Sequence, residues 1–364
     1  MLVIIYISAI ITIAYVAFAT VTFIGFLKAK KNSDNIIEST KQISVIVPFK
    51  NEANNILRLI ESLKKQTNSN FNVLLIDDNS TDNSYSIAEK AIIGIRNFSL
   101  YKNPLSGKKR AIEFAVSEST NNYFVTTDAD CLITKNWINS IVKNKITTSN
   151  QMVIMPVLMT TSDNSFLSHF QRNDYLALQM TTAGMAAVGN PVMCSGANLY
   201  FTKELYNNCK RWLHFDLPSG DDMFLMLASK KQQFNIGYLL DNNVAVETKS
   251  EIGLRNFVNQ RIRWGSKAKN YTDKGVIIIG LIPLLTYLSV LINIILSVNN
   301  FIYLFTALST MAILTICNYF LIYSFIRFFK KQKKIKYFVL SQLVYLLYFP
   351  IIALLSFIGI YKWK

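Results

Sequence analysis

The chain has 364 residues and a formal net charge of +16, and 51% of its residues are hydrophobic. This length allows one sizeable core plus additional elements. Its four cysteines are scattered without the paired spacing of a zinc site, so neither a zinc centre nor a disulfide framework is expected. Aromatic and basic residues do not alternate as in nucleic-acid modules, so we expect no nucleic-acid partner.

The N-terminal segment, residues 3–27, contains no charged side chain and is long enough to cross a bilayer, which takes about 20 residues. Three lysines follow this segment: Lys28, Lys30 and Lys31. A secretory signal peptide would carry its positive charge first. The pattern therefore predicts an uncleaved transmembrane helix over residues 1–31.

After a polar linker, residues 32–42, two buried strands are predicted at residues 43–49 and 71–76. Each is followed by a helical pattern, which begins near Ile56 and near Ile87. Strand, helix, strand and helix in this order indicate a parallel sheet with right-handed crossovers. Such sheets bind ligands at the carboxyl ends of their strands.

Acidic side chains follow two of the predicted strands. The second strand ends at Asp77-Asp78-Asn79-Ser80-Thr81-Asp82, a turn rich in helix-capping residues. The run over residues 123–131 ends in Asp128-Ala129-Asp130, and in a strand these two carboxylates would share one face. They suit Mg²⁺ or Mn²⁺, although a plain turn in which aspartate caps the backbone remains the alternative. Carboxylates at one sheet edge repel each other unless something positive lies between them, such as a cation on a diphosphate.

Basic residues open the helix predicted over residues 111–117, with the sequence Gly107-Lys108-Lys109-Arg110. Positive charge at a helix N-terminus opposes the helix dipole but suits a bound anion, toward which the free N–H groups also point. A solvated basic turn is the alternative. Further along, residues 166–188 predict a helix at the border with the membrane. We expect its single histidine, His169, and also His214 to be structural.

The C-terminal third of the chain alternates between membrane-type and basic segments. Residues 251–269 predict a basic amphipathic helix on the inner leaflet. Three spans are predicted at residues 275–298, 301–326 and 337–360, with a basic loop at residues 327–336. Four crossings with both termini outside place all twelve lysines and arginines that flank the first three spans on the cytoplasmic side.

Several motifs in this order resemble the inverting, nucleotide-sugar-dependent family 2 glycosyltransferases of GT-A fold. They are Val-Pro-Phe-Lys-Asn-Glu at 47–52, the acidic turn at 77–82, Gly-Lys at 107–108 and Asp-Ala-Asp at 128–130. Ser219-Gly220-Asp221-Asp222 resembles the family's acidic pair. Gln260-Arg261-Ile262-Arg263-Trp264 is similar to the Gln-x-x-Arg-Trp motif of membrane-bound members, such as cellulose, chitin and hyaluronan synthases and ceramide glucosyltransferase.

The resemblance implies an α/β GT-A catalytic domain over residues 32–250. It also implies an interfacial helix with the Gln-x-x-Arg-Trp motif over residues 251–274 and three C-terminal spans over residues 275–364. Asp222 would be the catalytic base, Asp130 with Asp128 would hold Mg²⁺ or Mn²⁺, and Trp264 with Asp221 would contact the acceptor. The donor would contact Pro48, Asn51, Glu52, Asp77, Asp78, Lys108, Asp128, Gln260 and Arg263. Ser195-Gly196-Ala197-Asn198 resembles a loop near the acceptor.

The expected function is sugar transfer from a nucleotide-diphosphate sugar to a lipid or glycan acceptor at the cytoplasmic face of the cell membrane. Four spans are fewer than the cellulose-synthase type uses for a polymer channel, so a homo-oligomer or an export partner remains possible. The alternative is a non-catalytic nucleotide-sugar-sensing or assembly subunit. A transporter is disfavoured because the predicted spans contain no buried charges.

Overall fold

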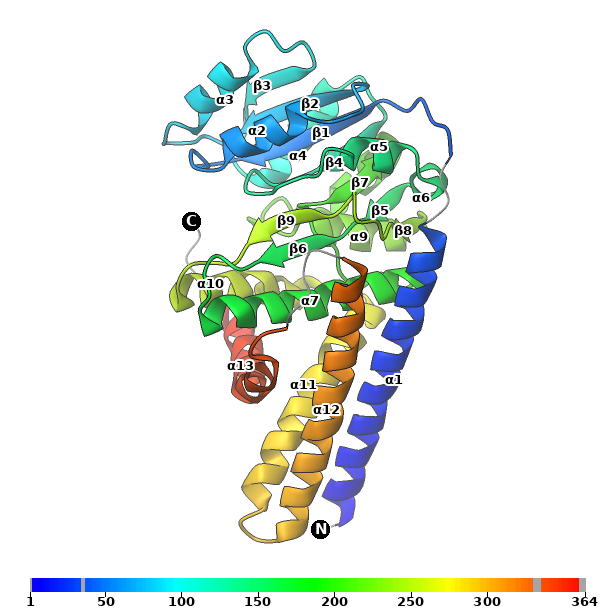
Figure 1. Cartoon of the computed structure of the whole chain (residues 1–364), viewed down its shortest axis with the longest axis vertical. Helices are drawn as coiled ribbons and strands as arrows, with labels where there is room; N and C mark the ends of the chain where they lie inside the picture. The colour runs from blue at the N-terminus through cyan, green and yellow to red at the C-terminus, as the bar shows by residue number, and fades with distance from the viewer. Residues whose placement is uncertain (1, 34–36, 330–334, 360–364) are drawn as a thin grey trace. The chain divides into compact units, whose positions relative to one another are not determined.

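The computed structural model describes residues 2–33, 37–329 and 335–359, and its course is drawn in Figure 1. The chain divides into two compact units. The sheet unit comprises Leu27–Leu158 and Ala186–Lys249, and the helical unit comprises Met1–Phe26, Met159–Met185 and Ser250–Lys364. These units cut across the expected domain at 32–250, because residues 159–185 group with the apolar helices.

The sheet unit is built on a seven-stranded mixed sheet in the order β3-β2-β1-β4-β7-β5-β8. Strands β1, β2, β3 and β4 are parallel, and β7 runs antiparallel to both β4 and β5. The strand bounds are β1 Ile43–Phe49, β2 Phe71–Asp77, β3 Phe98–Lys102, β4 Tyr123–Thr126, β5 Met152–Ile154, β7 Leu199–Thr202 and β8 Ile236–Tyr238. The parallel half confirms the predicted α/β class.

Strand β1 lies at the centre of the parallel half and is buried along its whole length. It pairs with β2 from Ile43 to Phe49, whereas its pairing with β4 ends at Ile46. Pro48 therefore lies beyond the β4 ladder, where a missing N–H removes no bond to that strand. The polar loop that follows β1 therefore lies at the carboxyl edge of the sheet.

Helices flank this sheet in the usual manner of an α/β unit. Helix α4 packs on β1 and β2, while α3 packs on β2, β3 and α2. Helix α2 shows the predicted periodicity, since Ile56, Leu59, Ile60 and Leu63 are buried. The helix bounds are α2 Ile56–Lys64, α3 Ser84–Ile92, α4 Lys108–Glu118, α5 Trp137–Val142, α6 Lys145–Ser149, α8 Lys203–Cys209 and α9 Asp221–Lys231, with a 3₁₀ turn at Lys210–Trp212.

Strand β4 is shorter than predicted. It ends at Thr126, and the backbone then turns, with the Cys131 N–H donating to the Asp128 carbonyl at 3.1 Å. Asp128 and Asp130 therefore lie just past the strand's end, as expected, but they lie in a turn, so the strand period does not set their directions. A second, two-stranded sheet pairs β6, Val157–Thr160, with β9, Val246–Lys249.

Three long apolar helices of the helical unit run side by side (Figure 1). They are α1 Leu2–Asn32, α11 Lys274–Leu296 and α12 Phe301–Phe328. Polar pairs join them: Thr12 lies 3.2 Å from Thr310, the Tyr15 hydroxyl donates to Asn318 at 2.6 Å, and Ser8 contacts Ser289. Hydrogen bonds of this kind hold helices together where no water competes.

Three further helices complete the helical unit: α7 Phe166–Ala187, α10 Leu254–Gly265 and α13 Phe338–Ile358. A 3₁₀ segment, Ser266–Asn270, joins α10 to α11. Within the described residues, α1, α11, α12 and α13 are long and apolar enough to cross a membrane. The predicted apolar segments are thus helical, with ends shifted by a few residues; the basic loop at 327–336 lies partly outside the described residues.

Candidate active site

The carboxyl ends of β1, β2 and β3 meet around Asp78. Its Oδ1 atom accepts two hydrogen bonds at 2.7 Å, from the Asn103 side-chain amide and from the Gly107 backbone N–H. The Asp78 N–H donates to the Phe49 carbonyl at 2.8 Å, which fixes the residue to the end of β1. The Asp78 carboxylate therefore joins the end of β2 to the loop after β3, while its backbone N–H joins it to the end of β1, as expected for a residue at the carboxyl ends of parallel strands.

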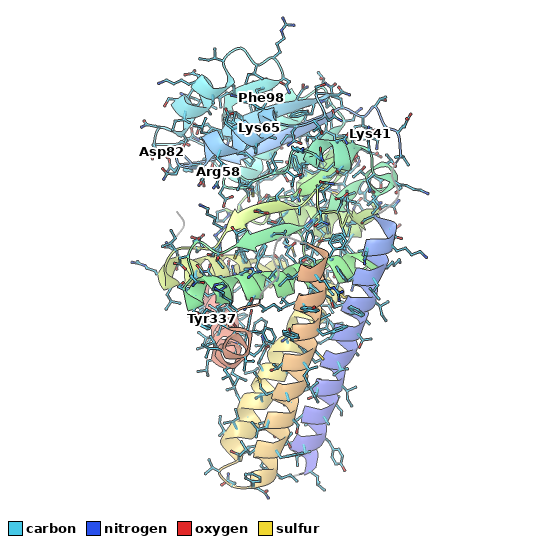
Figure 2. The ribbon with its side chains drawn as sticks, in the orientation of Figure 1. Lys41, Arg58, Lys65, Asp82, Phe98 and Tyr337 are labelled. Carbon is cyan, nitrogen blue, oxygen red and sulfur yellow. The ribbon has the colours of Figure 1, made fainter. Side chains whose placement is uncertain are left out.

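The loops after β1 and β2 are tied to each other by short polar contacts. Asn51 adopts the left-handed conformation, with φ +55°, and its side-chain oxygen accepts from the Thr81 N–H at 2.8 Å. The Glu52 N–H donates to the Ser84 hydroxyl at 2.7 Å, and the Ala53 N–H donates to Asp82 at 3.2 Å. Asp82, labelled in Figure 2, therefore closes one side of this loop pair. Asp77 binds within its own turn, through the Ser80 N–H at 3.3 Å.

Lys108, at the start of α4, lies between two carboxylates. Its Nζ atom is 2.7 Å from Asp128 Oδ1 and 3.5 Å from Asp221 Oδ2. Burial favours the neutral amine, but the two carboxylates outweigh it and raise the pKa of Lys108, so the ammonium persists across the neutral range. The positive charge that the acidic edge needs is thus supplied in part by the chain itself.

The two carboxylates of the Asp-Ala-Asp turn have different partners. Asp128 faces Lys108, whereas Asp130 Oδ2 accepts from the Thr248 hydroxyl on β9 at 3.0 Å. Arg58, which extends from α2 (Figure 2), donates to the Asp130 carbonyl at 3.1 Å. Burial raises the pKa of the Asp128 carboxyl against the opposing effect of Lys108, and the nearby Asp130 adds to the rise.

This pair of carboxylates fits a divalent cation of one particular kind. Within the described residues, no group of three or more His, Cys, Asp or Glu side chains is placed to hold a metal ion. Mg²⁺ and similar cations commonly bind one or two carboxylates, several waters and the phosphates of a substrate. Asp128 and Asp130 match that donor set, and they match a closed cage of protein ligands poorly.

The acidic pair opens α9. Gly220 precedes it with φ +88°, a left-handed conformation that favours glycine, and Asp221 and Asp222 form the first turn. Asp222 Oδ2 accepts from the Gly196 N–H at 3.0 Å, and its Oδ1 accepts from the Met223 N–H at 2.7 Å. Both oxygens are therefore held by backbone donors, which fixes the direction of the carboxylate.

Gly196 suits this arrangement because a larger residue would displace its neighbours. A Cβ atom there would stand 2.8 Å from Asp221 Oδ2 and 3.3 Å from Lys108 Nζ. The loop at 195–198 therefore lies close to both the acidic pair and Lys108. Asn198 in the same loop is buried and structural, since its amide bonds the carbonyls of Pro156 and Val244 at 2.8 Å each.

The Gln-x-x-Arg-Trp motif lies on α10 in the helical unit. Gln260 donates to Glu251 at 3.0 Å and accepts from Arg261 at 2.6 Å, so both ends of its amide are bonded within that unit. The Arg261 guanidinium lies 4.3 Å from the centre of the Trp264 ring. Arg263 and Trp264 are half-buried.

Sequence reasoning missed Arg261, which is the buried arginine of this motif. Its Nε atom donates to Asp174 Oδ2 of α7 at 2.8 Å, and the Tyr345 hydroxyl of α13 donates to Asp174 Oδ1 at 2.5 Å. It also missed Asn103 and Thr248. Asn103 follows a parallel strand and could have been found by the rule that identified Asp78, whereas Thr248 reaches Asp130 from a strand without any local signal.

Lys109 has a structural role in the basic turn. Its Nζ atom is buried and donates to the carbonyls of His214 and Leu217 at 2.6 and 3.0 Å. The neighbouring Arg110 pairs with Glu113 at 2.7 Å on the helix surface. Of the three basic residues that open α4, Lys108 forms ion pairs with Asp128 and Asp221.

Comparison with known proteins gives the same family as the motifs. The model of glycosyl transferase family 2 matches residues 44–209. Glycosyltransferase GlyG of Streptococcus pneumoniae serotype 4 is 27% identical over 201 residues, which is 52% of this chain and 66% of that protein. Teichoic acid poly(glycerol phosphate) polymerase of Staphylococcus epidermidis is 33% identical over 93 residues, 24% of this chain and 13% of that protein. The matches span less than two thirds of either relative.

A solved structure has a similar course of the chain. The mannosyltransferase PcManGT from Pyrobaculum calidifontis, in complex with GDP-Man and Mn²⁺, superposes with a TM-score of 0.51 at 16% identity. The match covers 94% of this chain and 99% of that one, and it supports a GT-A-like fold. The family model matches residues 44–209, which is less than half of the chain, and it identifies a glycosyl transferase family 2 domain there.

Proposed function

We propose that the chain is a membrane-embedded glycosyltransferase that moves a sugar from a nucleotide-diphosphate sugar to a hydroxyl group, with inversion at the anomeric carbon. One observation carries the proposal: Lys108 lies between Asp128 and Asp221, while the N–H of Gly196, a residue whose added Cβ would stand 3.3 Å from Lys108 Nζ, donates to Asp222. This links the proposed donor side of the site to the proposed base within one small cluster.

The donor nucleotide is assigned to the loops at the carboxyl ends of β1 and β2. Asp78 is assigned as the main contact for the base or ribose, because the loop after β3 and the end of β1 fix its orientation. Pro48, Asn51, Glu52 and Asp77 shape the same edge. Lys108, which stays protonated, pairs with the diphosphate as its charge increases on departure.

Asp128 and Asp130 are the residues that would hold a divalent cation together with the diphosphate. When bound, such a cation supplies Lewis-acid stabilisation for the leaving group. The Mn²⁺ that accompanies GDP-Man in the mannosyltransferase of similar fold supports this assignment. Thr248 and Arg58 steady Asp130 from two sides, so the turn offers its carboxylate in one orientation.

Asp222 is assigned as the base. As the acceptor oxygen forms its bond to the anomeric carbon, the bond from that carbon to the diphosphate breaks and the acceptor's proton passes to the Asp222 carboxylate. The Gly196 and Met223 N–H groups hold the carboxylate in place during this step. Asp221 faces Lys108 and the acceptor side.

The acceptor is proposed to be a lipid or a glycan at the cytoplasmic face of the cell membrane. Apolar helices long enough to cross a bilayer support the membrane location, and the lysines and arginines beside the spans support the orientation. The motif residues Gln260, Arg263 and Trp264 on α10 are assigned to the donor phosphates and the acceptor sugar, by resemblance to membrane-bound family members.

The purified full-length chain in lipid nanodiscs, given a panel of UDP- and GDP-sugars and membrane lipids, tests the proposal. We expect release of the nucleoside diphosphate with one donor, a sugar added to a lipid or glycan by mass, and loss of both with EDTA. Asp130→Asn is expected to need more Mn²⁺ or Mg²⁺ than the parent, whereas Asp216→Asn, at an exposed carboxylate, is expected to behave as the parent.

If the chain binds a donor but releases no nucleoside diphosphate with any member of the panel, the proposed transfer reaction is contradicted. That result would favour the alternative function, a nucleotide-sugar-sensing or assembly subunit.

A further inference from the structure

Helix α13 has an exposed face made of large apolar side chains. They recur every three or four residues and are 48–61% exposed: Leu340, Leu343, Leu347, Ile351, Leu354 and Ile358. This spacing puts them on one side of the helix. A stripe of this size on the described surface needs a cover, because exposed apolar patches of this extent mark interaction sites.

Side chains of α13 outside this stripe meet polar or charged partners near the start, at the middle and near the end of the helix. Near its start, Asn173 of α7 lies 3.5 Å from the Ser341 hydroxyl. At its middle, the Tyr345 hydroxyl donates to Asp174. Near its end, Lys269 Nζ lies 5.0 Å from the centre of the Phe357 ring.

These partners fix the depth of α13 relative to a bilayer. A helix of this length rises about 30 Å, which is about the thickness of the hydrocarbon core. If α13 crossed, either Lys269 or the Asp174–Arg261 pair would be drawn toward the hydrocarbon interior, where ionised side chains are costly. A helix lying along the interface keeps all of its charged partners at one level, beside the headgroups.

The direction of the helix agrees with this reading. Within the helical unit, α1, α11 and α12 run along the plane of Figure 1, whereas α13 is seen nearly end-on. If the first three cross a bilayer, α13 runs across that direction. Tyr337, labelled in Figure 2, packs at the start of α13 against Phe166 and His169 of α7, with ring centres 5.9 and 5.5 Å apart.

We propose that α13 does not cross the bilayer but lies in the plane of one leaflet, with its apolar stripe covered by lipid acyl chains. After α1 crosses the bilayer, α11 and α12 cross it in opposite directions. Helix α13 therefore begins on the side of the membrane on which α1 ends. It then remains there. Three crossings replace the expected four, and the two ends of this chain lie on opposite sides.

Charge supports the same side for the C-terminal segment. Lys362 and Lys364 follow α13 in the sequence, and four crossings would place both of them on the side opposite the other flanking basic residues. Three crossings place them on the positive side, as the distribution of lysine and arginine in membrane proteins favours. The inference rests on the proposed membrane location and is independent of the proposed transfer reaction.

Epitope tags test the sidedness directly. One tag is placed before Met1, one after Lys364 and one, as a control, in the turn at 297–300 of the full-length chain, in separate variants. External protease is added to intact protoplasts and to permeabilised ones. We expect the first and control tags to be accessible on one side of the membrane and the C-terminal tag to be accessible only on the other.

Accessibility of the N-terminal and C-terminal tags on the same side would overturn the in-plane assignment while leaving the membrane location standing. Release of the chain by alkaline carbonate would overturn the membrane location itself. A Leu347→Cys variant tests the cover of the stripe: we expect no cross-linking between copies beyond the parent's level. A cross-linked dimer specific to this variant would show that a second copy of the chain, and not lipid, covers the stripe, and it would contradict the proposal.

Discussion

At the residue scale, the site depends on a few side chains whose direction is fixed by the backbone. Asp78 and Asp222 each accept from backbone N–H groups, so neither relies on a mobile partner for its orientation. Lys108 joins the two regions by contacting Asp128 and Asp221. Preorganised charge of this kind contributes to catalysis because nothing has to reorient during the reaction.

Gly196→Ala tests how closely this cluster is packed. The added Cβ would stand 2.8 Å from Asp221 Oδ2 and 3.3 Å from Lys108 Nζ, so both side chains must shift. We expect turnover to fall about 10- to 100-fold, because displacements well below 1 Å already misalign reacting groups. The thermal midpoint should change little, since the atoms that must move end flexible side chains.

The control for this variant is Gly280→Ala on α11, where an added Cβ meets no atom within 4 Å. Steady-state rates and thermal midpoints of both variants give the comparison. Unchanged turnover in Gly196→Ala would remove the loop at 195–198 from the site.

Sequence reasoning succeeded at residues where a local rule applies. Asp78 was placed by the rule that parallel strands bring their carboxyl ends to one edge, and the same rule would have found Asn103. The same rule placed Asp128 and Asp130 just beyond β4, but it did not predict their partners. Their partners Lys108 and Thr248 lie 20 and 118 residues away, and such contacts leave no local pattern.

At the element scale, α7, α10 and α13 are joined through one buried ion pair. Asp174 and Arg261 are 7% and 5% exposed, and Tyr345 adds a hydrogen bond to the same carboxylate. A second connection runs from Gln171 to the Glu251 backbone, with two hydrogen bonds of 2.9 Å. The helix that carries the Gln-x-x-Arg-Trp motif is therefore positioned by α7 on one side and by α13 on the other.

Asp174→Asn is expected to destabilise the helical unit strongly. It leaves the Arg261 guanidinium buried without its counter-charge, and breaking a buried pair costs about 3–5 kcal/mol. Replacing both partners, with Asp174→Leu and Arg261→Met, is expected to recover most of the loss because no isolated charge remains.

The loss of folded protein after heating in detergent, followed by size-exclusion chromatography, measures both variants. Glu61→Gln is the control, since it removes a pair with Lys64 on the exposed surface of α2, and such pairs contribute little. Equal stability of Asp174→Asn and the parent would show that the pair does not hold these helices together.

Helices α1 and α7 approach each other closely at two glycines. A Cβ on Gly184 would overlap the Thr22 carbonyl, and a Cβ on Gly25 would overlap the backbone of Gly184. Small residues allow such backbone contact between helices. We expect Gly184→Ala to lower stability by about 1–3 kcal/mol, since backbone atoms cannot move aside as a side chain can.

The same thermal assay tests this contact, with Gly280→Ala again as the matched glycine control. A midpoint for Gly184→Ala equal to that of the control would mean that α1 and α7 are not packed as described.

The elements themselves were predictable in proportion to their hydrophobic pattern. Strands β1 and β2 and the four apolar helices were located within a few residues because their apolar runs are long. The short strands β5, β7 and β8 have three or four residues each and are defined by pairing with distant strands, so no local run identifies them. Hydropathy located α13 but carried no information on its direction, which packing against α7 and α10 determines.

At the scale of the whole molecule, the chain joins a domain that matches glycosyl transferase family 2 to helices that, within the described residues, are long and apolar enough to cross a membrane. In the proposed function, the acidic edge of the sheet provides the chemistry, and the apolar helices hold the chain at the membrane where a lipid or glycan acceptor would be found. The central claim is that residues far apart in sequence form one transfer site, with Asp222 as its base.

Asp222→Asn, assayed for sugar transfer alongside direct titration of donor binding, tests that claim most directly. If Asp222 is the base, transfer is expected to fall by about 10²–10⁴-fold, because a positioned base contributes about that much. Donor affinity should stay within about threefold of the parent, since the nucleotide contacts lie at the ends of β1 and β2, and Asp216→Asn should change neither quantity. Transfer at the parent's rate by Asp222→Asn would contradict the assignment of Asp222 as the base.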